Sequence, residues 1–208
     1  QEMAEFTMLA FELSDKYRNP AVVLTDGFVG QMMEPLELED NEIQPPEKPW
    51  AVKGTPETRA NLISSIYLET DELEAHERRM EAKYIRAQEA EPRCELTRTE
   101  DAEVLLVGYG IVSRVLLSTV EALRKDGVKA GLFRPITLWP YPSKALVEAA
   151  AKVQKVLVVE LSNGQMVEDV RLALNGKVPV EFYGRVGGNV PSVRELQQEV
   201  LTRMVVAV

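Results

Sequence analysis

Residues 103–110 read Glu103-Val104-Leu105-Leu106-Val107-Gly108-Tyr109-Gly110, an apolar run that ends in a glycine-rich turn. Four consecutive apolar residues of this kind are typical of a strand that is buried on both faces of a parallel sheet. Residues 111–125 follow with the pattern of a helix, and Gly127 is a residue type that commonly ends helices. This stretch therefore predicts one strand followed by one helix.

The same alternation occurs three more times toward the end of the chain. Apolar segments at 128–133, 155–161 and 178–183 are each followed by a helical segment. Strand–helix units joined by right-handed crossovers make the strands parallel and place helices on both faces of the sheet. We therefore predict an α/β fold with three layers, α/β/α, around a mostly parallel sheet.

The first 31 residues predict one further unit. Residues 3–17 carry apolar side chains three and four positions apart, which favours a helix that ends before Pro20. Residues 21–25 read as a buried parallel strand, and residues 26–31 form the loop at its carboxyl end. Because the helix begins without an initiating Met or a cap, we expect a fragment of a longer protein that starts with the end of an earlier domain.

The middle of the chain has a different composition. Residues 34–56 contain five prolines and an excess of acidic residues, which predicts a linker or an extended strap lying on a partner. Residues 71–91 predict a long, charged helix that ends at Pro92. His76 lies on its apolar stripe, so we interpret this histidine as a packing or interface residue rather than a catalytic base.

Composition excludes several classes of protein. The chain has 208 residues, a net charge of −9, and a single cysteine, Cys94. One cysteine and one histidine exclude a disulfide-stapled scaffold, a Cys/His zinc site and an iron–sulfur cluster held by this chain alone, and they favour a cytoplasmic location. The negative charge argues against nucleic acid and anionic membranes as partners, and no apolar run approaches the roughly 20 residues of a membrane span.

The turn Gly108-Tyr109-Gly110 resembles the start of a dinucleotide-binding motif. Ser113 replaces the third glycine, and Arg134 lies where an acid would bind the ribose. We therefore favour an ordinary turn between a strand and a helix. A nucleotide- or CoA-binding module stays open as an alternative.

Asp26 and Gly27 are the other candidate site residues. Thr25-Asp26-Gly27 resembles the start of a thiamine-diphosphate metal site, but the asparagine-bearing segment that would complete the Mg²⁺ ligands does not follow. We therefore expect a turn in which Gly27 has a positive φ angle. The loop still lies where α/β proteins bind ligands, so Asp26, Gly27 and Gln31 are candidates to face an active site. No catalytic residue and no metal ligand is assigned.

Two loops near the same sheet edge carry further hypotheses. Residues 134–142 contain three prolines with Trp139 and Tyr141, which favours a subunit contact and leaves a pure assembly module as an alternative. The helix that starts beside Asn163-Gly164 could bind an anion. Cys94 is interpreted as a buried small apolar residue.

Six separated blocks resemble the alpha chain of the 2-oxoacid:ferredoxin oxidoreductases, of the branched-chain (2-ketoisovalerate) type. In order along the chain they are Asp15-Lys16-Tyr17-Arg18-Asn19-Pro20, Asp26-Gly27 through Gly30-Gln31-Met32-Met33-Glu34-Pro35, Lys48-Pro49-Trp50-Ala51-Val52, Arg134-Pro135-Ile136-Thr137-Leu138-Trp139-Pro140, Gly164-Gln165-Met166-Val167-Glu168-Asp169-Val170-Arg171 and Tyr183-Gly184-Arg185. The resemblance implies that residues 1–34 are the tail of a thiamine pyrimidine-binding domain and that residues 35–92 are a linker with a long helix. It implies a transketolase C-terminal-like domain over 93–208, whose five-stranded sheet has an antiparallel edge strand near 93–97.

The resemblance also implies an activity for the whole complex. Such enzymes decarboxylate a 2-oxoacid oxidatively, deliver the acyl group to coenzyme A and reduce ferredoxin, using thiamine diphosphate, Mg²⁺ and iron–sulfur clusters. Beta, gamma and ferredoxin-like delta subunits are the implied partners. The glutamate that activates thiamine is absent from these residues, so we expect this chain to be inactive alone, to bind no cofactor alone, and to supply structure and subunit contacts.

Overall fold

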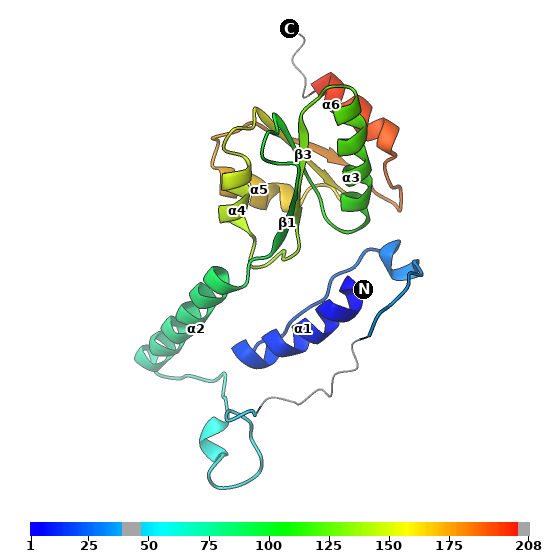
Figure 1. Ribbon diagram of the computed structural model, residues 1–208. Coiled ribbons are helices and arrows are strands. Elements are labelled where there is room, and N and C mark those ends of the chain that lie inside the picture. Colours follow the sequence, from blue (N-terminus) through cyan, green and yellow to red (C-terminus); the bar gives the residue numbers. More distant parts are fainter. Residues whose placement is uncertain (39–46, 204–208) are drawn as a thin grey trace. The chain divides into compact units, whose positions relative to one another are not determined.

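The computed structural model describes residues 1–38 and 47–203 (Figure 1). These residues form two compact units that alternate along the sequence. One unit contains residues 1–24 and 33–87, and the other contains residues 25–32 and 88–203. The short segment Thr25–Met32 therefore folds with the C-terminal unit, although its neighbours in sequence on both sides belong to the other unit.

The C-terminal unit is built on one five-stranded sheet. The strand order is β1-β3-β2-β4-β5, with β1 antiparallel to β3 and every other pair parallel. The strands are β1 Cys94–Thr97, β2 Val104–Val107, β3 Ala130–Pro135, β4 Lys155–Glu160 and β5 Val180–Gly184. The mostly parallel sheet and the antiparallel edge strand expected from the sequence are both confirmed.

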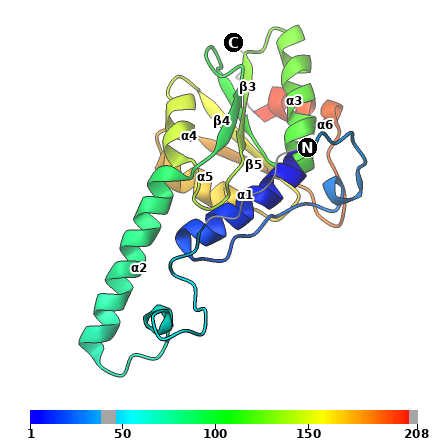
Figure 2. The same ribbon diagram turned by 60° about the horizontal axis from the view of Figure 1, so that its bottom comes forward.

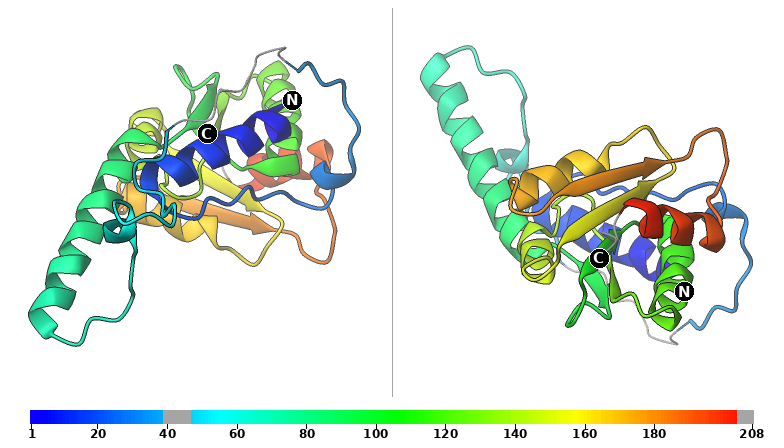
Figure 3. Two further views of the ribbon diagram at one scale, coloured as in Figure 1. Left: turned by 90° about the horizontal axis from the view of Figure 1, so that it is seen from below. Right: turned by 90° about the horizontal axis from the view of Figure 1, so that it is seen from above.

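Helices cover both faces of this sheet (Figure 2, Figure 3). They are α3 Gly110–Lys125, α4 Ser143–Ala149, α5 Met166–Leu174 and α6 Val193–Arg203, with α3 beside α6 on one face and α4 beside α5 on the other. Leu105 and Leu106 are adjacent in β2 and point to opposite faces, and each is fully buried in a different apolar cluster. The three-layer α/β/α architecture is confirmed.

The N-terminal unit contains α1 Glu2–Tyr17 and most of α2 Thr70–Ala90. Helix α1 has no buried residue, and Phe11 is 73% exposed. The expected buried strand at residues 21–25 does not form, and Val22 is 82% exposed. A strand needs a neighbour to pair with, and the described residues of this unit contain no strand.

Hydrogen bonds and a cation–π contact connect the described part of the proline-rich segment to the C-terminal end of α1. The Asn61 side-chain amide donates to the carbonyls of Pro49 and Ala51 at 2.8 and 3.0 Å. Arg18 donates to the Asn61 carbonyl at 2.9 Å and lies over the Trp50 ring. This part is therefore an ordered strap on its own unit, while residues 39–46 lie outside the described ranges.

His76 has the packing role expected of it, whereas Cys94 is less buried than expected. His76 in α2 stacks on Tyr67 with ring centroids 4.7 Å apart, and its Nδ1 lies 3.0 Å from the Tyr67 hydroxyl. Cys94 is half-buried against the apolar cluster under α4 and α5, and burial raises the pKa of its thiol. Within the described ranges, every helix is too short or too polar to cross a membrane.

Candidate functional site

The carboxyl ends of β2 and β4 form the place where an α/β fold of this topology can bind ligands. From β2 the chain continues through α3 to β3 on one side, and from β4 it continues through α5 to β5 on the other. Ligands in open α/β sheets bind where connections diverge in this way. The loops at this point contain Gly108-Tyr109-Gly110 and residues 161–165.

Asp26 caps helix α3 from a segment 85 residues away in sequence. Its Oδ2 accepts a hydrogen bond from the Ile111 amide at 2.8 Å, while Oδ1 accepts from the amides of Phe28 and Val29 at 3.0 and 2.9 Å. Tyr109, which occupies the N-cap position of α3, makes no side-chain cap of its own. The Asp26 carboxylate thus lies at the helix end where a dinucleotide motif would place a pyrophosphate, which argues against nucleotide binding by this turn.

Glu160 caps the N-terminus of helix α5 in the same manner. This residue is only 2% exposed at the end of β4. Its Oε1 accepts from the Val167 amide at 3.0 Å, and Oε2 accepts from the Met166 and Gln165 amides at 3.1 and 3.2 Å and from the Ser162 hydroxyl at 3.0 Å. The helix N-terminus beside Asn163-Gly164, which from the sequence could bind an anion, is therefore capped by a carboxylate of the chain itself.

Two tyrosines near these carboxylates remain neutral phenols. Burial raises the pKa of Tyr109, and the negative charges of Glu160 and Asp26 raise it further. Burial also raises the pKa of Tyr141, with a smaller contribution from Asp169, far above the physiological range. Both phenols are therefore neutral near neutral pH, beside the two bonded carboxylates at this edge of the sheet.

The structure places the three candidate site residues from the sequence, Asp26, Gly27 and Gln31, in different environments. Asp26 reaches the diverging strand ends, as a residue of a ligand-facing loop should, but both of its oxygens are already bonded to amides. Gly27 lies in the expected turn without a positive φ angle, so that part of the expectation was wrong. Gln31 is exposed in the short helix η1 Val29–Gln31. Glu160 was missed as a cap, and its only local signal is an acid that ends an apolar strand.

The described residues do not fit a metal–diphosphate site. They contain no group of three or more His, Cys, Asp or Glu side chains placed to hold a metal ion. Mg²⁺ needs near-octahedral oxygen ligands, and the two carboxylates at this edge are committed to backbone amides. In the described structure, these two carboxylates anchor the loops at this edge of the sheet.

The Asp26 cap predicts how two glycine substitutions differ. An added Cβ at Gly110 would conflict with Asp26 Oδ2 at a φ of +60°, whereas at Gly127, with a φ of +84°, it would meet no described atom within 4 Å. Both alanine substitutions impose backbone strain of roughly 1–2 kcal/mol, but Gly110→Ala should cost about 1 kcal/mol more because it displaces the cap.

A double-mutant cycle by urea denaturation tests this difference. In an Asp26→Ala background, the extra cost of Gly110→Ala should disappear, because the atom that causes the conflict has been removed. Persistence of that extra cost would show that Asp26 does not hold the start of α3.

Two family models together match nearly the whole chain. The model described as "Pyruvate flavodoxin/ferredoxin oxidoreductase, thiamine diP-bdg" matches residues 1–99, and "Pyruvate:ferredoxin oxidoreductase core domain II" matches residues 102–196. Ketoisovalerate oxidoreductase subunit VorB of Methanothermobacter thermautotrophicus is 47% identical over 201 residues, which are 96% of this chain and 57% of that protein. The chain thus spans little more than half the length of such relatives.

More distant relatives belong to enzymes named for other 2-oxoacids. The 2-oxoglutarate synthase subunit KorA of Methanocaldococcus jannaschii is 32% identical over 97% of this chain and 61% of its own length. Pyruvate synthase subunit PorA of Pyrococcus horikoshii is 26% identical over 87% of this chain and 49% of its own length. The solved 2-oxoglutarate:ferredoxin oxidoreductase from Magnetococcus marinus shares the fold, with a TM-score of 0.62 and 22% identity over 80% of this chain and 30% of that one.

Proposed function

Because the chain belongs to the family of 2-oxoacid:ferredoxin oxidoreductase subunits, we propose that it is part of an enzyme that oxidises branched-chain 2-oxoacids of the 2-ketoisovalerate type. The products would be CO₂, an acyl-CoA and reduced ferredoxin. One observation carries this proposal: identity to two ketoisovalerate oxidoreductase subunits is 47% and 46%, against 29–32% for the 2-oxoglutarate synthase subunits.

We also propose how the cofactors are divided between this chain and the rest of the enzyme. Thiamine diphosphate would supply the carbanion chemistry, and the match of residues 1–99 to a thiamine-binding model supports its use. We propose that Mg²⁺, the iron–sulfur clusters and the activating glutamate are provided by other subunits or by protein regions that this sequence does not contain. This chain has a single cysteine and, in its described part, no metal-binding cluster.

The remaining assignments are also proposals. Residues 1–34 would be the tail of the pyrimidine-binding domain, residues 35–92 the linker with its helix, and residues 93–208 the transketolase C-terminal-like domain. The partners would be beta, gamma and ferredoxin-like delta subunits. The single cysteine supports a cytoplasmic location.

The proposal is tested by comparing the assembled enzyme with the isolated chain. With thiamine diphosphate, Mg²⁺, coenzyme A and a viologen acceptor, the assembled enzyme should have a higher kcat/KM for 2-ketoisovalerate than for 2-oxoglutarate or pyruvate, by about tenfold or more. The isolated chain should give no turnover. A preference for 2-oxoglutarate or pyruvate would reject the substrate assignment, and turnover by the isolated chain would reject the division of labour.

A further inference from the structure

Asparagine followed by glycine occurs twice in the chain, in the turns on either side of helix α5. Asn163-Gly164 lies before the helix, and Asn175-Gly176 follows it. The asparagine side chain of such a pair can react with the peptide nitrogen that follows it, because glycine has no Cβ and leaves the backbone mobile and accessible. The two pairs have the same sequence, so the fold decides which of them is free to react.

The fold holds the pair before α5 in one conformation. The Gly164 amide donates to the Ser162 hydroxyl oxygen at 3.1 Å, and this hydroxyl donates in turn to the buried Glu160 carboxylate at 3.0 Å. The next amide, that of Gln165, also donates to Glu160. The Gly164 nitrogen therefore reaches the Asn163 side chain only if these hydrogen bonds break.

The pair after α5 has none of these restraints. Asn175 ends the helix in the left-handed conformation with a φ angle of 46°, and Gly176 follows with a φ angle of 73°. Both residues are exposed, and among the described residues neither the Asn175 side chain nor the Gly176 N–H takes part in a hydrogen bond. A Cβ added at Gly176 would meet no described atom within 4 Å, so the turn has room to move. Both reacting groups are therefore free in the folded chain.

The other described asparagines are restrained or cannot react in this way. Asn19 precedes Pro20, whose nitrogen carries no hydrogen. The Asn61 carboxamide donates to two backbone carbonyls at 2.8 and 3.0 Å, and that of Asn189 donates to one at 3.3 Å. In the part of the chain that the structure describes, Asn175 is thus the one asparagine with an unbonded side chain and an unbonded glycine N–H after it.

We propose that Asn175 is a site of spontaneous deamidation in the folded protein, with water as the co-reactant. The Gly176 nitrogen forms a bond to Cγ of Asn175, and the bond from Cγ to the carboxamide nitrogen breaks. That nitrogen takes the proton of the Gly176 amide and leaves as ammonia. Water then opens the resulting succinimide ring at either of its carbonyls, which yields aspartate or isoaspartate without any change of oxidation state.

Both products differ from asparagine in ways that affect this turn. Each places a negative charge at the C-terminal end of α5, where the helix dipole is itself negative. Isoaspartate also adds one methylene group to the backbone of the turn that leads to β5. The chain should therefore lose thermal stability as the modification accumulates.

Peptide mass spectrometry of the 208-residue chain, incubated in neutral buffer below its thermal midpoint, measures the conversion of amide to acid at each site. In the folded chain the rate at Asn175 should exceed that at Asn163 by about tenfold or more, because the hydrogen bonds at Gly164 must break before Asn163 can react. In urea that unfolds the chain, the two rates should become similar, because both asparagines precede glycine. Equal rates in the folded chain, no conversion at Asn175, or an unchanged ratio in urea would overturn the proposal.

Two variants separate the effect of the fold from that of the sequence. Ser162→Ala removes the oxygen that accepts from the Gly164 amide, so the rate at Asn163 should rise towards that at Asn175. An unchanged rate at Asn163 in this variant would contradict protection by the hydrogen bond. Asn175→Gly removes the reacting carboxamide, and glycine readily adopts the left-handed conformation found there. Its thermal midpoint should stay constant during an incubation in which that of the wild type falls, and an equal fall in both proteins would overturn the predicted loss of stability.

Discussion

Glu160→Ala should lower the free energy of unfolding of the C-terminal unit by about 3 kcal/mol, one of the two largest single-residue effects expected in this chain. The carboxylate binds three backbone amides at the start of α5 and the Ser162 hydroxyl, at a residue that is 2% exposed. Alanine leaves the Met166 and Val167 amides without partners among residues that are themselves buried. Buried donors without acceptors cost roughly 1–3 kcal/mol each.

Glu168→Ala is the matched control for this prediction. Glu168 is also an acid near the start of α5, but its side chain is 69% exposed and pairs with Arg171 one turn later. Its removal should change stability by no more than about 0.5 kcal/mol. Glu160→Gln should fall between the two, because the amide keeps one acceptor but directs an NH₂ group at backbone donors. Equal urea midpoints for Glu160→Ala and Glu168→Ala would show that the buried carboxylate is not the cap.

The sheet could be predicted from the sequence because its signals are local. The four apolar residues of β2 become four buried residues, and the order of strand and helix along the chain restricts the topology to a few arrangements. The resemblance supplied the antiparallel edge strand, since residues 94–97 by themselves carry no strong strand pattern.

The caps at the diverging strand ends could not be predicted because they depend on distant or ambiguous residues. Asp26 and Ile111 are 85 residues apart, and an Asp-Gly pair by itself indicates only a turn. Glu160 reads from sequence as the polar end of a strand, and only the fold shows that α5 begins directly above it. Both caps matter for function, because carboxylates of the chain occupy the N-termini of α3 and α5, which could otherwise bind phosphates.

The missing strand at residues 21–25 has a different cause. Its composition is that of a buried parallel strand, but composition predicts a strand only where a neighbouring strand is available. Residues 26–31, which directly follow this segment, are ordered because Asp26 joins them to α3 rather than because a sheet precedes them. Local order around Asp26 is therefore set by the C-terminal unit.

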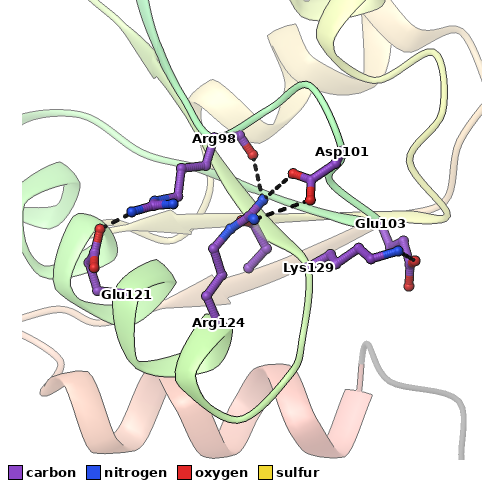
Figure 4. A network of polar contacts seen from close by, with 7 residues as sticks. Arg98, Asp101, Glu103, Glu121, Arg124 and Lys129 are labelled. Atoms are coloured by element: carbon purple, nitrogen blue, oxygen red, sulfur yellow. Dashed lines mark hydrogen bonds and ion pairs between the residues drawn. The ribbon is translucent and has the colours of Figure 1, made fainter.

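Arg124→Met should destabilise the C-terminal unit by about 2–3 kcal/mol, although it keeps most of the apolar length of the side chain. The guanidinium donates to the Ala130 carbonyl at 2.7 Å, to the Arg98 carbonyl at 2.9 Å and to the Asp101 carboxylate at 2.7 and 3.3 Å (Figure 4). It thereby joins the end of α3, the turn between β1 and β2, and the start of β3. Only 19% of the Arg124 side chain is exposed.

Lys129→Met provides a control in the same network, because Lys129 makes one exposed pair with Glu103 at 2.8 Å (Figure 4). Its loss should cost at most about 0.5 kcal/mol. Arg124→Lys should be intermediate, since an ammonium cannot reach three separated acceptors with the geometry of a guanidinium. Equal urea midpoints for Arg124→Met and Lys129→Met would show that the guanidinium is not the joint between these three segments.

Acid denaturation separates the carboxylate from the carbonyl contacts of Arg124. The hydrogen bond from Arg124 lowers the pKa of Asp101 below its ordinary value of 3.8. A carboxyl whose pKa is lower in the folded state stabilises the fold above its ordinary pKa, and this contribution is lost as pH falls through the lowered value. The wild type has a higher free energy of unfolding than Arg124→Met, and this difference should become smaller below about pH 4. The part of the difference that comes from the two carbonyl contacts should remain. If the difference in free energy of unfolding between the two proteins stays constant from about pH 6 to about pH 3, the Asp101 carboxylate does not contribute to the stabilisation by Arg124.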